Sequence, residues 1–323
     1  MQTSQDTISS PKIKDYRVTR LSKDNLADVA KLHEVVYGVA PSPGYFNKKY
    51  DTRYTGVEYV GFIAYNSDNM AVAYYGVLPC FMEYNDSVML SAQSADTMTH
   101  PEFRYKGMFV ALSDMTFDLC RQLGIRLIFG FPNQNSYPGM VSKLAWKVTE
   151  LMTCFKIPVK TFPLESFSIK VPGLNRLYKG YRNSILSKKL LALQGVRNSV
   201  LADGFAGLQR NGKFLDYKSY SPAKVIGIEG AKIWLSNKQG FIIGDIEGLT
   251  EANFSRVISK LHGMVKRLGV REWQFHCSPG TSLHSLFARR YPQTPSYPVL
   301  FQNFGSAIAP EKIKFTFADI DIF

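Results

Sequence analysis

The stretch Ala95–Leu112 reads ADTMTHPEFRYKGMFVAL, and it decides how the rest of the chain is interpreted. It predicts a strand that ends near Thr99, a short basic loop with one glycine, and a helix that begins after Gly107. Such a loop directs several backbone N–H groups to one point, at the positive end of a helix dipole. Arg104 and Lys106 add positive charge there. The stretch therefore predicts a binding site for a phosphate group.

The segments on either side of this stretch predict an α/β domain. Alternating or continuous apolar runs predict strands at 17–21, 59–65, 71–77, 88–99 and 125–131, and a final strand at 150–160. Helical spacing of apolar residues predicts helices near 24–37, 110–123 and 139–146. The order is strand, helix, three strands, phosphate loop, helix, strand, helix, strand. The apolar character of these strands indicates a sheet that is covered on both faces.

This order, together with two motifs, resembles the GNAT superfamily, the GCN5-related N-acetyltransferases. Motif A of that superfamily is Arg/Gln-x-x-Gly-x-Gly/Ala, and the chain has Arg104-x-x-Gly107-x-Phe109. The family's Asn-bearing loop and helix ending in Lys-x-Gly-Phe are matched by 132–146, which ends in Lys143-Leu144-Ala145-Trp146. The resemblance covers roughly residues 15 to 160. The amino-acid sequences of both segments also resemble those of the two-domain acetyltransferase-like proteins of bacterial surface-polysaccharide loci.

The resemblance implies acetyl-CoA as acyl donor and no metal. The pyrophosphate is then expected at the backbone N–H groups of residues 104 to 109, and Phe109 stands where the family usually has a small residue. The expected cofactor-binding residues are Thr97, Met98, Thr99, Arg104, Tyr105, Lys106, Gly107, Met108, Phe109, Asn133 and Asn135. For Asn133 and Asn135, capping of the following helix is the alternative role.

Acetyl transfer to an amine needs a base for the ammonium and an acid for the departing thiolate. The tyrosine that the family often uses as the acid is replaced by Val141, so Tyr137, one turn earlier, is the expected substitute. Asp96 is the expected base, on the strand where family members often carry a carboxylate, and a structural hydrogen-bonding role is its alternative. Further candidates at the chain end are Asp319, Asp321 and the terminal carboxylate of Phe323.

The chain of 323 residues is long enough for two domains. We expect a flexible tail at 1–15, a GNAT domain at 16–165, a basic linker or helical segment at 166–215, and a second α/β domain at 216–323. In the second domain Gly248-Leu249-Thr250 precedes the long helix in place of motif A. This half therefore reads as a degenerate GNAT-like repeat that shapes the acceptor cleft. The segment 312–323 is expected to begin as a strand.

Two further segments carry open alternatives. Tyr45–Tyr54 is aromatic and basic, so it reads either as a mobile flap near the acceptor or as a surface helix with aromatic anchors. Leu174–Leu191 reads as a basic amphipathic helix. It is expected either to contact an anionic membrane surface or a lipid-linked substrate, or to pack on the sheet with a solvated basic face.

Composition limits the partners and the compartment. The net charge is +13 and the pI is about 9.4, which favours an anionic partner such as CoA. Nucleic acid is not the expected partner. No apolar run approaches the ~18 residues of a membrane span, and the first residues do not resemble a signal peptide. The four cysteines are far apart and predict buried thiols in a reducing compartment, hence a cytoplasmic protein.

The sequence thus predicts an acetyl-CoA-dependent N-acetyltransferase that acts on the amine of a small polar molecule. An amino-sugar of a surface-glycan precursor is the acceptor that the resemblance suggests. One alternative is an aminoacyl-tRNA-dependent peptidyltransferase of peptidoglycan synthesis, a family that also pairs two GNAT-like domains but does not need the CoA loop. A second alternative is a non-catalytic acyl-CoA-binding protein that has kept the fold and lost the chemistry.

Overall fold

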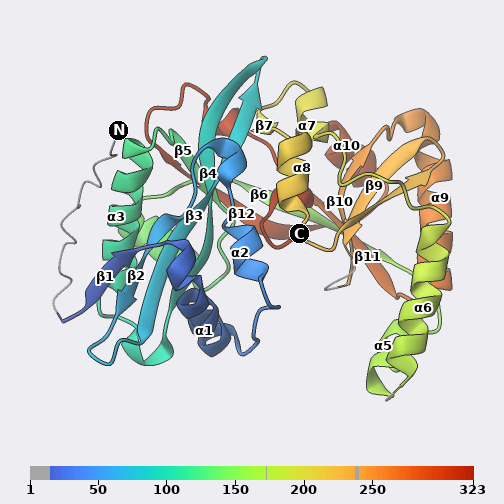
Figure 1. Ribbon diagram of the computed structural model, residues 1–323. Coiled ribbons are helices and arrows are strands. Elements are labelled where there is room, and N and C mark those ends of the chain that lie inside the picture. The colour runs from blue at the N-terminus through green and yellow to red at the C-terminus, as the bar shows by residue number, and fades with distance from the viewer. Residues whose placement is uncertain (1–14, 172, 237–239) are drawn as a thin grey trace.

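The computed structural model describes residues 15–171, 173–236 and 240–323, so the predicted tail lies outside the described residues except for Asp15. The described strands form one twelve-stranded sheet (Figure 1). The strands are β1 (Arg17–Arg20), β2 (Val60–Tyr65), β3 (Ala71–Tyr84), β4 (Ser87–Thr99), β5 (Leu127–Gly130), β6 (Lys147–Pro158), β7 (Gly207–Leu208), β8 (Lys224–Ile228), β9 (Ala231–Ser236), β10 (Phe241–Glu247), β11 (Glu272–Cys277) and β12 (Gln293–Asn303). The helices are α1 (Leu26–Tyr37), α2 (Tyr45–Lys49), α3 (Met108–Gln122), α4 (Tyr137–Leu144), α5 (Leu164–Lys170), α6 (Leu174–Ser187), α7 (Ser199–Ala202), α8 (Gly212–Lys218), α9 (Glu251–Arg267) and α10 (Ser282–Ala288). The predicted mixed sheet with flanking helices is confirmed.

Helices cover both faces of the first half of the sheet. Successive side chains of a strand point to opposite faces. Phe62 and Ala64 of β2 therefore share a core with α3, while Ile63 and Tyr65 share a core with α1. All six residues of β2 are buried, as expected for a strand that is covered on both faces.

The two halves of the chain are interleaved within this sheet. The strand order is β1-β2-β3-β4-β5-β12-β6-β11-β10-β9-β8. Each half has one parallel pair, β4 with β5 and β10 with β11, and each pair is joined by a long helix, α3 or α9. Between these pairs, β12 of the second half lies between β5 and β6, and β6 of the first half lies between β12 and β11. Strands of the two halves therefore alternate in the middle of the sheet, although the predicted linker at 166–215 separates the halves in the sequence.

Strand β12 was not anticipated from the sequence, because prolines interrupt it. A proline cannot donate a hydrogen bond to a sheet, and it is tolerated in a central strand only at a bulge. Pro295 and Pro298 lie at the two sides of a register shift, where β12 stops following β6 residue by residue. Similarly, the strand expected at 71–77 continues to Tyr84 as β3. Pro79 is tolerated in it because it lies beyond Val77, where pairing with β2 has ended.

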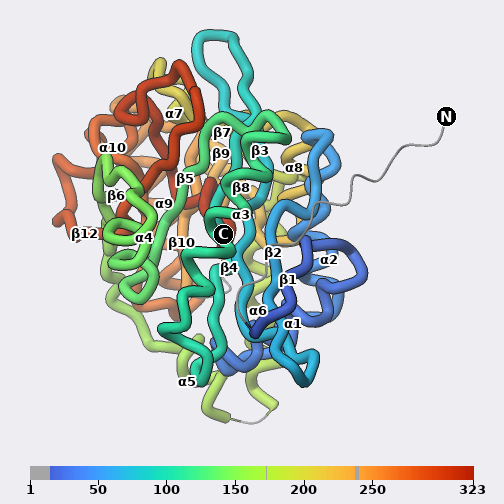
Figure 2. The backbone as a smooth tube through the Cα atoms, turned by 90° about the vertical axis from the view of Figure 1, so that its left-hand side faces the viewer, coloured from blue at the N-terminus to red at the C-terminus, as the bar shows by residue number. Residues whose placement is uncertain are grey.

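The expectation that 312–323 begins as a strand is wrong. This segment has only isolated bridges, Ile313 to Ala206 and Thr316 to Cys277, followed by a 3-10 turn at Phe317–Asp319. The turn forms because the Thr316 N–H donates to the Asp319 carboxylate, at 2.8 Å. The segment contacts β10 and β11 beyond the point where these strands stop pairing. Figures 1 and 2 both place the C terminus in the middle of the molecule.

Candidate functional site

The basic loop before α3 leaves a helix N-terminus open. Gly107 is the N-cap, with φ of +78°, and no side chain caps the helix. A Cβ atom on Gly107 would meet nothing within 4 Å, so the space beside its backbone is open. The first turn of a helix has N–H groups without intrahelical acceptors. Arg104, Tyr105 and Lys106 are all exposed beside this turn, so the loop can receive an anion.

The corresponding helix of the second half is closed. Thr250 is the N-cap of α9, and it forms a capping box with Asn253. In a capping box the side chains of the two residues satisfy N–H groups of the first turn reciprocally. The helix terminus that is open in α3 is therefore occupied by the protein's own side chains in α9, in line with the missing motif A there.

Strands β4 and β5 diverge immediately next to this loop. They pair only at Ala92–Ile128 and Gln93–Phe129, although β4 continues to Thr99. We call the divergence beyond these pairs the first wedge. A bulge lies on its β4 side, where the register against β3 shifts, and Asp96 within it has φ of +51°. Such a bulge turns a side chain that would otherwise follow the alternation of the strand.

The expected cofactor residues of β4 and α3 differ in their access. Thr97 and Thr99 are half-buried. Met98 and Met108 are almost completely buried in the cores under α1 and α3, so only their backbone groups remain for a ligand. All four residues were predicted to bind the cofactor because they belong to motif A or the strand before it. In the structure, Thr97 and Thr99 can offer side chains to a ligand, whereas Met98 and Met108 can offer only backbone groups.

Phe109, which replaces the small residue of the motif, packs between helices. Its ring contacts Gly139 of α4, where an added Cβ would lie 3.1 Å from a ring carbon. On its other side it meets Tyr75 edge to face, with ring centroids 6.0 Å apart. The bulk of Phe109 is thus accommodated by a glycine in the facing helix, and its side chain contributes to the α3–α4 contact.

Asn133 and Tyr137 lie at the start of α4, at the carboxyl end of β5. The Asn133 carboxamide oxygen accepts from the N–H groups of Asn135 and Ser136, at 2.9 and 3.1 Å. The Asn133 side chain therefore orders the turn before α4 and does not cap the helix, whose N-cap is Ser136 without a side-chain hydrogen bond. Asn133 and Asn135 are both exposed. Tyr137 is half-buried, and its hydroxyl makes no hydrogen bond among the described residues. Val141, at the position of the family's tyrosine, is exposed.

A buried ion-pair cluster lies on the β4 side of the first wedge. The Lys49 ammonium is 2.7 Å from Asp96 and 2.7 Å from Asp321. The Tyr50 hydroxyl donates to Asp96 at 2.9 Å, and the Gln93 amide donates to Asp321 at 3.1 Å. We call these five residues the carboxylate cluster.

The electrostatics of the cluster favour a charged lysine. The Lys49 side chain is 1% exposed, whereas both carboxylates are 12% exposed. Burial acts to lower the pKa of Lys49, but Asp321 and Asp96 outweigh burial and hold it well above its usual value. One ammonium thus faces two carboxylates, and only the carboxylates reach solvent. Because Lys49 ends α2 and is buried, the Tyr45–Tyr54 segment is not simply a surface helix.

Tyrosines surround this cluster. The Tyr217 hydroxyl donates to the Lys49 carbonyl at 2.8 Å, and the Tyr220 hydroxyl donates to the Asp321 carbonyl at 3.0 Å. Burial and then Asp96 raise the pKa of the phenol of the half-exposed Tyr37. The Lys218 ammonium donates to the Ile320 carbonyl at 2.7 Å, and burial lowers its pKa to about 8. Together these contacts hold the chain end against the first half.

A cavity of about 1060 Å³ lies between elements of both halves, and none of the five cluster residues lines it. Burial and then the Asp321 carboxylate raise the pKa of the phenol of Tyr297, which does line it. The lining combines the β5–α4 loop with β6, β11 and β12: Pro132, Asn133, Gln134, Tyr137, Val148, Thr149, Glu150, Leu151, Cys154, Lys156, Gln274, His276, Pro295, Ser296, Tyr297 and Pro298. Tyr137 and Asn133 thus face a space that both halves of the chain build.

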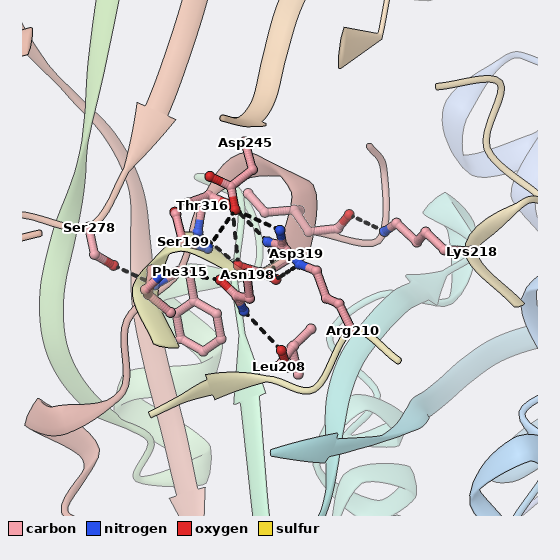
Figure 3. A network of polar contacts seen from close by, with 12 residues as sticks. Asn198, Ser199, Leu208, Arg210, Lys218, Asp245, Ser278, Phe315, Thr316 and Asp319 are labelled. Carbon is pink, nitrogen blue, oxygen red and sulfur yellow. Dashed lines mark hydrogen bonds and ion pairs between the residues drawn. The ribbon is translucent and has the colours of Figure 1, made fainter. Parts of the chain in front are cut away.

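The second divergence, between β10 and β11, is filled by the chain itself. The Arg210 guanidinium is 2.6 Å from Asp245 of β10 and 2.8 Å from Asp319 of the chain end. Figure 3 shows its contacts with these two carboxylates. All three side chains are at most 1% exposed. The ring of Phe323 lies against Gly244, where a Cβ would be 2.2 Å from it. The region of the second half that corresponds to the first wedge therefore holds protein, not open space.

Several of these residues were missed from the sequence. The C-terminal carboxylates were noted, and the structure separates them: Asp321 joins the carboxylate cluster, whereas Asp319 pairs with Arg210. Lys49 was seen only as part of a basic, aromatic segment. Nothing in the local pattern marks Gln93, Arg210 or Asp245, because their partners are distant in sequence.

The predicted buried thiols are confirmed, since all four cysteines are buried and free. Burial raises the pKa of Cys80 and of Cys120 to about 12. Within the described ranges no three His, Cys, Asp or Glu side chains gather as a metal-ligand set. Nor does any described helix combine the length and apolarity needed to span a membrane.

Comparison with protein families identifies the first half. Residues 17–149 match the family model described as acetyltransferase (GNAT) domain. This range includes β1 to α4 and with them the basic loop, the first wedge and Tyr137. The first half of the chain therefore carries a GNAT acetyltransferase domain. No curated protein matches the chain by sequence.

Solved structures extend the likeness to most of the chain. A probable N-acyltransferase from Enterococcus faecalis V583 matches with a TM-score of 0.57 and 14% identity, over 90% of this chain and 73% of that one. A GCN5-related N-acetyltransferase from Kribbella flavida has a TM-score of 0.57 and 12% identity, over 90% and 71%. Saccharomyces cerevisiae N-myristoyltransferase, with bound myristoyl-CoA, has a TM-score of 0.56 and 10% identity, over 92% and 85%. At these identities the likeness shows the fold, and it confirms that the GNAT-type fold includes the second half.

Proposed function

We propose that this protein is an acyl-CoA-dependent N-acyltransferase, with acetyl-CoA as the expected donor and the amine of a small polar molecule as the acceptor. One observation carries the proposal. A single β4–α3 unit, inside the range that matches the GNAT domain, combines an uncapped helix N-terminus at Gly107 with the exposed edge of a carboxylate cluster at Asp96.

The donor end of the site fits the pyrophosphate of CoA. The first turn of α3 offers N–H groups without intrahelical acceptors, and Gly107 has no Cβ to keep a phosphate away. Arg104 and Lys106 are exposed next to it and free to add positive charge. When bound there, acyl-CoA supplies an activated thioester carbonyl. The carboxamide of Asn133 and the backbone of Thr97 are the groups that we assign to the arm of the donor.

The acceptor end of the site fits an amine. Asp96 and Asp321 share one ammonium, so the cluster retains a surplus negative charge at its exposed edge. That charge attracts a cationic acceptor, and a carboxylate then removes the proton, because only the neutral amine attacks. We assign proton acceptance to Asp96, supported by Asp321. The C–N bond forms as the C–S bond breaks. The Tyr137 hydroxyl gives its proton to the thiolate that leaves and recovers a proton from the newly bonded nitrogen.

The cavity lined by Tyr137 is the expected location of the acceptor. Its volume of about 1060 Å³ exceeds what an amine group needs, so most of the acceptor is held there. Tyrosines, an acid and a base line it, which suits a polar molecule such as an amino-sugar of a surface-glycan precursor. A cytoplasmic location fits the four buried free thiols.

Calorimetric titration with acetyl-CoA tests the proposal. We expect saturable binding by the wild-type protein, and loss of binding by the double variant Arg104→Ala with Gly107→Trp. Arg126→Ala with Lys213→Ala is the matched control, since both residues are exposed and lie outside the loop. Binding would justify a screen of amine acceptors by thiol release. Absence of binding by the folded wild-type protein would refute the proposal.

A further inference from the structure

We infer that α5, α6 and Phe162 form a surface that docks on an anionic membrane face. This surface, which we call the basic hairpin, is remote from the first wedge and does not depend on the proposed function. Figures 1 and 2 place α5 at the lower edge of the molecule, and Figure 1 shows α6 beside it, below α9.

The basic hairpin exposes large apolar side chains. Six of them have between 37% and 70% of their surface exposed: Phe162, Leu164, Phe167, Ile169, Leu177 and Tyr181. The rings of Phe162 and Phe167 contact each other, with centroids 6.0 Å apart. Leu177 of α6 has the largest exposed fraction of the six, 70%. Soluble proteins seldom expose so many neighbouring apolar side chains unless a partner covers them.

The same segment is strongly basic. Between residues 160 and 189 the only acidic residue is Glu165, and the basic residues are Lys160, Lys170, Arg176, Lys179, Arg182, Lys188 and Lys189. All of these except the half-buried Arg182 are exposed. Within the described part of the chain, no carboxylate forms an ion pair with any of the seven. The basic side chains are therefore available to an external anionic partner.

One side of α6 is already used to hold the hairpin on the body. The Tyr178 hydroxyl donates to the Leu268 carbonyl at 2.9 Å, and the Tyr181 hydroxyl donates to the Arg267 carbonyl at 2.9 Å. Leu186 is buried in the core that α9 covers. One side of α6 therefore packs on the body of the protein, which was one of the two roles expected for this segment. Leu177 and the exposed basic residues remain on the other side.

The combination of exposed apolar and basic side chains fits a membrane surface better than other anionic partners. An interfacial helix places aliphatic and aromatic side chains below the headgroups, and keeps Lys and Arg at the level of the lipid phosphates. Aliphatic side chains such as Ile169 and Leu177 have no comparable role against a nucleic-acid backbone, which is bound by charge and by stacking. The occupant that fits both features is a bilayer surface with anionic headgroups.

Vesicle flotation of the full chain tests this inference. The probes are vesicles of mixed phosphatidylcholine and phosphatidylglycerol, with pure phosphatidylcholine vesicles for comparison. We expect binding to the mixed vesicles only. We expect Arg176→Glu with Lys179→Glu, and separately Phe167→Ser with Leu177→Ser, to weaken binding roughly tenfold or more. The matched controls, Arg126→Glu with Lys213→Glu and Val39→Ser with Val88→Ser, change equally exposed residues elsewhere.

The outcomes are distinct from those of the donor test. Urea denaturation curves that match those of the wild-type protein show that the hairpin variants are folded, so their loss of vesicle binding would support the inference. No binding of the wild-type protein to anionic vesicles would overturn it. Equal weakening by the hairpin and control variants would overturn it as well, because only general charge would be involved. Binding to tRNA but not to vesicles would assign the surface to nucleic acid instead.

Discussion

The Lys49 ammonium lies 2.7 Å from the Asp321 carboxylate, although 272 positions separate these residues. The same ammonium lies 2.7 Å from Asp96 on β4. Residues at the end of the chain therefore place a carboxylate beside β4, the strand that leads into the basic loop before α3. Because the lysine is fully buried, the two carboxylates also compensate the cost of removing its charge from water.

This relationship predicts the effect of Asp321→Asn. The change leaves Lys49 with one carboxylate and removes the surplus negative charge of the cluster. We expect acyl transfer to an amine to fall roughly 100-fold or more, as for loss of proton transfer, with little change in the Kd for acetyl-CoA. Steady-state kinetics and calorimetry measure the two effects. Asp118→Asn, on the exposed face of α3, is the control. An unchanged kcat would remove Asp321 from the mechanism.

Arg210→Met is expected to destabilise the whole fold. Arg210 is fully buried between Asp245 and Asp319, and its loss leaves two buried carboxylates without a cation. Breaking a buried pair in this way costs about 3–5 kcal/mol in the free energy of unfolding. Urea denaturation measures it. Arg121→Met, which breaks the exposed pair with Asp118, should cost less than about 1 kcal/mol. Equal effects of the two changes would contradict this account of the chain end.

Tyr137→Phe separates catalysis from packing. The ring is retained, so the half-buried contact at the start of α4 is preserved, and only the hydroxyl is lost. If the hydroxyl protonates the thiolate, kcat falls roughly 100-fold while the Kd for acetyl-CoA stays the same. Tyr291→Phe, at a half-buried tyrosine outside the range that matches the GNAT domain, is the control. A kcat equal to that of the wild type would reduce Tyr137 to a packing role.

His276 predicts a loss of stability in mild acid. Burial, and to a lesser extent Lys156, lowers the pKa of His276 to about 4, below its ordinary value of 6.5. Above pH 6.5 the imidazole is neutral in both the folded and the unfolded protein, so it has no effect there. Between pH 6.5 and pH 4 the unfolded state binds the proton more readily, so folding loses about 3 kcal/mol over this interval.

The measurement is urea denaturation at pH 7.5 and pH 4.5, for the wild-type protein and for His276→Gln. Carboxylates contribute to the pH dependence of both proteins, so the difference between the two isolates the histidine. We expect the free energy of unfolding to fall less in the variant on acidification. Parallel curves for the two proteins would show that the folded protein accepts the proton on His276 without cost.

The first half of the fold was predictable because its signals are local. Gly107 precedes a helix whose apolar residues recur at helical spacing, and strands such as β2 and β5 are short apolar runs. Strand β12 was missed because Pro295 and Pro298 read as breaks, and only the neighbouring strands show that they lie at a register shift. The chain-end strand was wrongly expected, since alternation alone does not show whether a partner strand is available.

The candidate site likewise has one part that local sequence predicted and another part that it did not. Motif A and the Tyr137 loop follow from residues that are close in sequence, and they identify the GNAT domain together with its expected donor. The contacts of Asp96 did not follow from the sequence, because Lys49 and Asp321 come from segments on either side of it in the chain. The same holds for Arg210, which joins β10 to the chain end.

By itself, the sequence determined the βα loop with its open helix terminus, the buried thiols and the strong positive charge, since these depend on residue type and short spacing. Only the tertiary structure decided that the two halves exchange strands, that the second divergence is filled by the chain end, and that Asp321 reaches Lys49. The physical reason is that hydrogen bonds between distant strands and buried ion pairs require both partners to be placed by the whole fold. No local pattern of residues encodes such a placement.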